Sequence, residues 1–72
     1  MSKKIEKIYN KLDEIREELE ELKDECQDVY DGRSEKWQES EKGDEYSEMI
    51  DAIGDAASSV QDALDYLYDY AE

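Results

Sequence analysis

Apolar residues recur at alternating steps of three and four throughout the first half of the chain. They are Ile5, Ile8, Leu12, Ile15, Leu19, Leu22, Cys26 and Val29. This spacing is typical of the a and d positions of a coiled-coil helix, which share one stripe and face a neighbouring helix. With Ser2 as the N-cap and Asp31-Gly32 as a left-handed C-cap, the pattern predicts a first helix over about residues 3–30.

The same pattern returns in the second half of the chain. Its a and d positions are Tyr46, Ile50, Ile53, Ala57, Val60, Leu64, Leu67 and Ala71. With Asp44 as the N-cap, this run predicts a second helix over about residues 45–71. Because the two helices match in length, we expect them to pair in opposite directions, with Tyr30 near Tyr46.

Residues 31–44 do not keep either register. Extending the second pattern backwards would place Gly32 and Gly43 on the apolar stripe. Ser34 can cap one short helical turn, and the run from Ser40 to Gly43 predicts a corner leading into the second helix. The predicted fold class is therefore all-α. We expect a single domain over residues 1–72, an antiparallel helical hairpin (coiled coil) with an irregular corner.

The second helix has a wider apolar stripe than the first. The positions that flank the first stripe are mostly charged, whereas Met49, Ala56, Ala63 and Tyr70 flank the second. A small residue such as Gly54 also lets another helix approach closely. We expect two hairpins to form a homodimer, a four-helix bundle, through Met49, Ile53, Ala56, Val60, Ala63 and Tyr70. A monomer whose alanines only raise helix propensity is the alternative.

The charge of the chain is strongly negative and unevenly distributed. The net charge is −14, and no Lys or Arg follows Lys42, whereas nine carboxylates do. Such a surface repels nucleic acid and anionic lipid and attracts cationic partners. In an antiparallel pair, the lysines of the first helix would lie beside carboxylates of the second. This prediction places Lys3, Lys4, Lys7 and Lys11 against Asp62, Asp65, Asp69 and Glu72.

Few residues are suited to catalysis or to metal binding. The chain has no His and a single cysteine, Cys26, which excludes ordinary zinc sites and His-containing di-iron sites. The carboxylates fall at positions that face water, so we expect no enzyme activity, no metal and no cofactor. Cys26 is expected to be a small core residue. The N-terminus mixes charged and apolar residues, unlike a signal peptide or a membrane span, which predicts a cytoplasmic protein.

Six carboxylates of the second helix share one outer stripe and form the candidate binding surface. They are Glu48, Asp51, Asp55, Asp62, Asp65 and Asp69. Their spacing along the axis is about 5–10 Å at 1.5 Å per residue. A rod with such a row can occupy a phosphate-binding groove of another protein, as a DNA mimic. The alternative is that the stripe only keeps a small bundle soluble.

Aromatic residues add to this surface. Tyr66 and Tyr68 alternate with the carboxylates, and no single helix face can bury both of them together with Tyr70. Exposed Tyr and Trp side chains often carry binding energy, so we include Tyr66, Tyr68 and Trp37 among the candidate binding residues. The alternative for Trp37 is that it folds back over the open end of the bundle.

The run SEKWQESEKG, from Ser34 to Gly43, and the apolar pattern after it resemble small acidic helical-hairpin proteins encoded by bacteriophages and other mobile elements. The similarity covers about residues 30–71. It implies an inhibitor of a host defence nuclease or a nucleic-acid-binding protein, in the manner of anti-CRISPR or anti-restriction proteins. Such an inhibitor would act in the bacterial cell on a cationic surface of its partner. A structural oligomerisation module with no inhibitory role is the alternative function.

Overall fold

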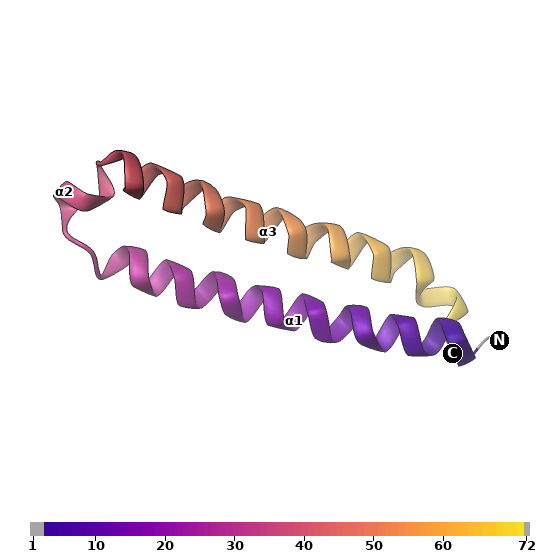
Figure 1. Cartoon of the computed structure of the whole chain (residues 1–72). Helices are drawn as coiled ribbons and strands as arrows, with labels where there is room; N and C mark the ends of the chain where they lie inside the picture. The colour runs from indigo at the N-terminus through magenta and orange to yellow at the C-terminus, as the bar shows by residue number, and fades with distance from the viewer. Residues whose placement is uncertain (1–2, 72) are drawn as a thin grey trace.

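The chain folds into two long helices that lie side by side. The computed structural model describes residues 3–71. Its elements are α1 (Lys3–Asp31), the short helix α2 (Glu35–Gln38), α3 (Glu41–Leu67) and the 3-10 turn η1 (Tyr68–Tyr70). α1 and α3 run in opposite directions, and α2 lies at one end of the pair (Figure 1). The described residues contain no strand, which confirms the all-α prediction. The predictions for Ser2 and Glu72 lie outside these residues.

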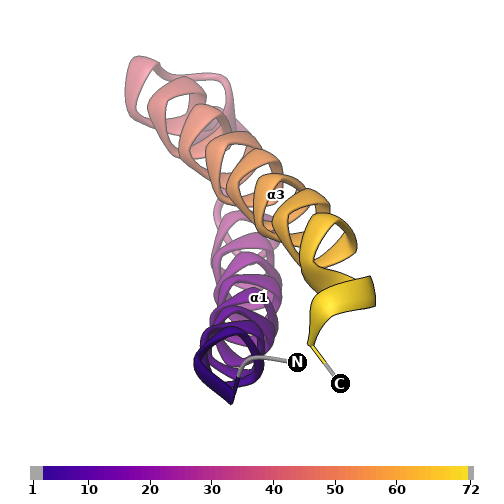
Figure 2. The same cartoon turned by 90° about the vertical axis from the view of Figure 1, so that its right-hand side faces the viewer.

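The helix pair is a single elongated layer. Its extents are 54 × 15 × 12 Å and its radius of gyration is 16.2 Å, against about 11 Å for a compact domain of this length. Seen towards the end where α1 begins, α1 and α3 are inclined to each other (Figure 2). Each long helix therefore has one long neighbour only. The buried apolar side chains of the described residues are Cys26, Ile50 and Leu64, which are 9%, 4% and 2% exposed.

The second long helix begins earlier than the sequence indicates. α3 begins at Glu41, and its N-cap is Ser40, whose hydroxyl accepts a hydrogen bond from the Gly43 N–H at 3.2 Å. The prediction of Asp44 as the N-cap was wrong, because Ser40 already satisfies the first turn from a position closer to α2. Ser34 does cap the short turn, as predicted, and accepts from the Trp37 N–H.

The same helix also ends earlier than predicted. α3 is α-helical to Leu67, and the chain then tightens into η1. No basic residue lies in the last turn of α3, and Asp65 and Asp69 place negative charge near the negative end of its dipole. This unfavourable charge gives a physical reason for the change of winding.

The end of α1 is capped by a side chain and not by a left-handed glycine. No glycine of the described chain has a positive φ, so the prediction of an Asp31-Gly32 left-handed cap was wrong. The side-chain amide of Gln38 instead donates to the Tyr30 carbonyl at 2.7 Å and to the Arg33 carbonyl at 3.4 Å. The Tyr30 carbonyl also accepts from the Arg33 N–H at 3.1 Å, so α2 supplies a second hydrogen bond at the end of α1.

The start of α3 is packed directly on the end of α2, and Gly43 makes this approach feasible. A Cβ at Gly43 would lie 2.7 Å from the carbonyl carbon of Gln38 and closer still to the carbonyl oxygens of Trp37 and Gln38. Trp37 lies between two tyrosines at this corner in edge-to-face contacts, with ring centroids 6.0 Å from Tyr30 and 5.7 Å from Tyr46. The corner is therefore a compact unit.

The apolar stripe of α1 meets α3 along one of its two rows only. Ile5, Leu12 and Leu19 are half-buried and Cys26 is buried, whereas the row Ile8, Ile15, Leu22 and Val29 is 43% to 52% exposed. The prediction that both rows form the seam was wrong. α1 is rolled so that Arg16 and Lys23 lie over the small residues of α3 and cover them with their long side chains.

Candidate protein-binding surface

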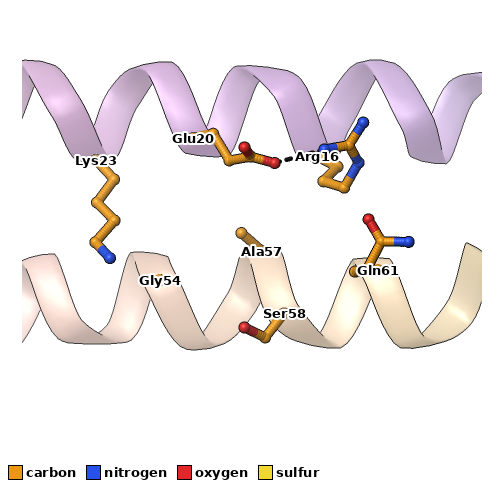
Figure 3. A pocket seen from close by; sticks show the side chains of 7 residues that line it. All are labelled: Arg16, Glu20, Lys23, Gly54, Ala57, Ser58 and Gln61. Carbon is orange, nitrogen blue, oxygen red and sulfur yellow. Dashed lines mark hydrogen bonds and ion pairs between the residues drawn. The ribbon is translucent and has the colours of Figure 1, made fainter.

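A shallow groove between α1 and α3 marks one broad face of the molecule. It has a volume of about 300 Å³ and is lined by Arg16, Glu20, Lys23, Gly54, Ala57, Ser58 and Gln61 (Figure 3). A Cβ at Gly54 would lie 3.1 Å from the Lys23 Nζ, so Gly54 is approached by a side chain. Within one chain, no other backbone approaches Gly54 among the described residues.

Arg16 is held in this groove by two carboxylates of its own helix. Its guanidinium lies 2.9 Å from Asp13 and 2.6 Å from Glu20. The hydrogen bond to Asp13 is the main reason that the pKa of Arg16 is raised, opposed in part by burial. Because both carboxylates are more exposed than the arginine, the charge nearest to solvent is negative.

The six predicted carboxylates all lie on the solvent side, five of them on α3 and Asp69 on η1. Glu48, Asp51, Asp55, Asp62, Asp65 and Asp69 are each exposed. At about 100° per residue, Asp65 stands on the flank of α3 beside the groove residue Gln61, Asp51 and Asp62 lie farther round the helix, and Asp55 is on the side turned away from α1. The Gln61 side-chain amide donates to Asp65 at 3.1 Å, which links the row to the groove.

The acidic surface extends onto α1, which the sequence did not indicate. Asp13 and Glu20 stand across the groove from the α3 row, since they bind Arg16 there. We call the α3 carboxylates together with Asp13 and Glu20 the acidic face. The sequence feature that could have indicated this extension is the spacing of Asp13 and Glu20, which are seven residues apart and therefore on one side of a helix.

Lys7 and Lys11 do not pair with the carboxylates of this face as predicted. Among the described residues, neither Lys7 nor Lys11 makes an ion pair with Asp62, Asp65 or Asp69. Helical rotation explains this, because Lys11 and Asp62 point to opposite faces of the layer. Asp62, Asp65 and Asp69 are therefore not neutralised by Lys7 or Lys11.

The predicted aromatic binding residues are not all in one place. Tyr66 is 80% exposed and lines an open hollow with Asp62 and Asp65. Tyr68 is also exposed, with its ring centroid 6.5 Å from that of Tyr9. Trp37 is half-buried in the corner, under the Arg33 guanidinium at 4.7 Å. Trp37 therefore supports the corner. This position agrees with the alternative interpretation, in which Trp37 folds back over the open end of the helix pair.

The opposite face of the layer is apolar. Ile15 and Leu22 directly precede the groove residues Arg16 and Lys23, so they are turned by about 100° away from the groove. The predicted dimer residues of α3 share this side: Ile53, Val60 and Ala63 are half-buried, and Met49, Ala56 and Tyr70 are exposed. We call Ile8, Ile15, Leu22 and Val29, with Met49, Ile53, Ala56, Val60 and Ala63, the apolar face. The sequence analysis did not predict that the α1 residues of this face are exposed.

Cys26 is buried between the helices, as predicted for a core residue, and lies beside Tyr46. Its interaction with the Tyr46 hydroxyl, followed by burial, raises the pKa of that tyrosine above the usual value of a phenol. No group of three or more His, Cys, Asp or Glu residues within 3–71 is placed to hold a metal ion. None of the helices in this range is long and apolar enough to cross a membrane.

Comparison of the chain with protein-family models, with curated proteins and with solved structures finds no match. The acidic face therefore has to be interpreted from its own residues.

Proposed function

We propose that this protein is a non-enzymatic binding module, an antiparallel helical hairpin whose acidic face docks on a cationic surface of another protein. We further propose a phage-type inhibitor of a host defence nuclease or nucleic-acid-binding protein. One observation carries the proposal: α3 has an unbroken series of exposed carboxylates on its solvent side, Glu20 of α1 and Asp65 of α3 border the groove, and the nearby cations, Arg16 and Lys23, lie within that groove.

The geometry suits a groove that normally holds a nucleic acid. The carboxylates from Glu48 to Asp69 extend over about 31 Å of α3 at 1.5 Å per residue. Asp13 and Glu20 supply a second row on a helix whose axis lies about 8–10 Å away. A DNA strand carries one phosphate per about 3.4 Å, so this face is a sparser polyanion, and its two rows increase the charge per length.

Binding to lysates of bacteria tests the proposal. The purified protein is immobilised, and captured proteins are identified by mass spectrometry at low and at high salt. We expect a protein that itself binds nucleic acid, and its release at high salt, since screening shortens the Debye length to about 3 Å at 1 M. DNA added in excess should compete for the same protein.

Matched charge variants separate recognition from general charge. Asp62→Lys plus Asp65→Lys should abolish capture of that protein while helicity is retained. Glu14→Lys plus Glu21→Lys makes the same change in net charge on the side of α1 turned away from α3, and it should leave capture intact. An equal loss of capture in both double variants would show that capture depends only on net charge, which would refute docking through the acidic face.

A second candidate function is supported by the apolar face. An assembly module would use the exposed row Ile8, Ile15, Leu22 and Val29 to join another helical protein, and its carboxylates would only maintain solubility. In that case, charge reversal at Asp62 and Asp65 leaves function unchanged, whereas a charge placed at Ile53 abolishes it.

A further inference from the structure

The apolar face leaves an unusual amount of hydrophobic side chain in contact with water. The row Ile8, Ile15, Leu22 and Val29 runs along most of α1, and each of its residues is at least 43% exposed. The helix pair is 54 Å long and 15 Å wide, so the whole side of the layer that carries this face has an outline on the order of 800 Å². That is the area each partner buries in a specific interface of standard size.

The charges beside this row are arranged in two blocks. Residues one helical turn from the apolar row, on its outer side, are Lys4 and Lys11 in the first half of α1 and Glu18 and Glu25 in the second half. These four positions are spaced by seven residues and therefore form one line along the helix. The line is basic at one end and acidic at the other.

Such a line is complementary to itself only in the antiparallel direction. A second α1 laid antiparallel places Lys11 opposite Glu18 and Lys4 opposite Glu25. The same alignment places Ile8 opposite Leu22 and brings Ile15 against the Ile15 of the other copy. The charged pairs and the apolar pairs thus agree in register to within one residue. A parallel alignment would place like charges together.

The alternative of α1 packing on α3 of the second copy lacks this complementarity. α3 has no Lys or Arg beyond Lys42, so Glu18 and Glu25 would find no cation there. We propose that the protein forms a two-fold symmetric dimer in which the apolar row of α1 pairs antiparallel with that of a second copy, with Ile15 beside the axis. Val60 and Ala63 of α3 then meet their counterparts near the same axis.

This dimer differs from the one that the sequence indicated, because α1 and not α3 supplies its charged and bulky contacts. It does not depend on the function proposed for the acidic face. Since the two faces lie on opposite sides of the layer, a dimer closed through the apolar face presents two acidic faces outwards. Self-association and partner binding can therefore be tested separately.

The mass of the protein in solution is the first test. Light scattering or sedimentation at micromolar concentration should give about 17 kDa, twice the 8.5 kDa of one chain. Ile15→Asp should reduce the mass to that of one chain, whereas Tyr66→Asp, which alters an exposed side chain away from the apolar face, should not. A wild-type mass of one chain at about 100 μM would overturn the proposal.

Charge exchange tests the direction of the pairing without touching the core. Lys11→Glu should weaken the dimer by roughly tenfold, because each altered pair occurs twice in a symmetric dimer. Lys11→Glu combined with Glu18→Lys should restore the wild-type dissociation constant to within about threefold. Failure of the second change to restore association would exclude this antiparallel register.

Cross-linking tests the register in the folded protein. In a Cys26→Ala background, Ile15→Cys should form a disulfide-linked dimer under mild oxidation, since residues at the axis come within the Cα separation of about 4.4–6.8 Å that a disulfide needs. Leu22→Cys alone should not form a disulfide-linked dimer. Ile8→Cys together with Leu22→Cys should form one. Faster cross-linking through Leu22→Cys than through Ile15→Cys would refute the alignment.

Discussion

Replacing Gly43 by alanine should destabilise the protein, although alanine is the better helix former. The new Cβ would lie 2.7 Å from the Gln38 carbonyl carbon and nearer to two carbonyl oxygens, all of them backbone atoms of α2. α2 would have to move away from α3, which disturbs the Ser40 cap and the Gln38 amide that satisfies α1.

The expected magnitude follows from opposing contributions. Overpacking costs about 1–3 kcal/mol, and a weakened N-cap costs about 1 kcal/mol. The higher helix propensity of alanine offsets up to about 1 kcal/mol. We expect a net loss of about 2 kcal/mol in the free energy of unfolding, or a melting temperature lower by roughly 10 °C.

Gly54→Ala is the matched control, because it makes the same change in the same helix. Its Cβ would meet the end of the Lys23 side chain at 3.1 Å, and this flexible chain can move aside. We expect a gain of about 0.5–1 kcal/mol from helix propensity. Urea and thermal unfolding followed by circular dichroism, at one fixed protein concentration, measure both variants. Stabilisation by Gly43→Ala, or shifts of the same sign in both, would refute the reasoning.

Three further predictions concern single side chains. Leu64→Ala should lower the free energy of unfolding by about 2–5 kcal/mol, because Leu64 is 2% exposed, whereas Tyr66→Ala should change it by less than about 0.5 kcal/mol; urea titration compares the two. Gln38→Ala should lower it by about 1 kcal/mol by removing the shorter of the two hydrogen bonds that the Tyr30 carbonyl accepts, the other coming from the Arg33 N–H, and a neutral result would contradict that cap. The pKa of Tyr46 is raised in the folded state by Cys26 and by burial, so the folded protein keeps this proton to higher pH than the unfolded chain. The stabilisation of the folded state by this proton is complete below the usual tyrosine pKa of about 10 and is lost as pH rises through the raised pKa of Tyr46. Tyr46→Phe should therefore make stability fall less steeply above about pH 10, and an unchanged alkaline slope would argue against the Tyr46 and Cys26 contact.

Much of the local structure is determined by the sequence alone. The alternation of three and four specifies two long helices, since no other regular structure places those residues on one side. Ser34 caps its short turn because a serine hydroxyl satisfies an N–H three residues on. The six α3 carboxylates are exposed because an apolar stripe on one side of a helix leaves the other side to water.

Only the tertiary structure decides which apolar row of α1 is buried. The rows Ile5 to Cys26 and Ile8 to Val29 are equally apolar and equally spaced, so the pattern itself cannot separate them. The choice depends on the shape of α3, whose small residues Gly54 and Ala57 accept the side chains of Arg16 and Lys23. That contact rolls α1 towards the groove.

The same rotation decides the composition of both faces. It brings Asp13 and Glu20 across the groove from the α3 carboxylates, and it turns Ile15 and Leu22 out on the other side. Spacing along a chain determines which residues share a side of one helix. How two helices are rotated against each other depends on the fit of side chains between them, which is a property of the folded pair.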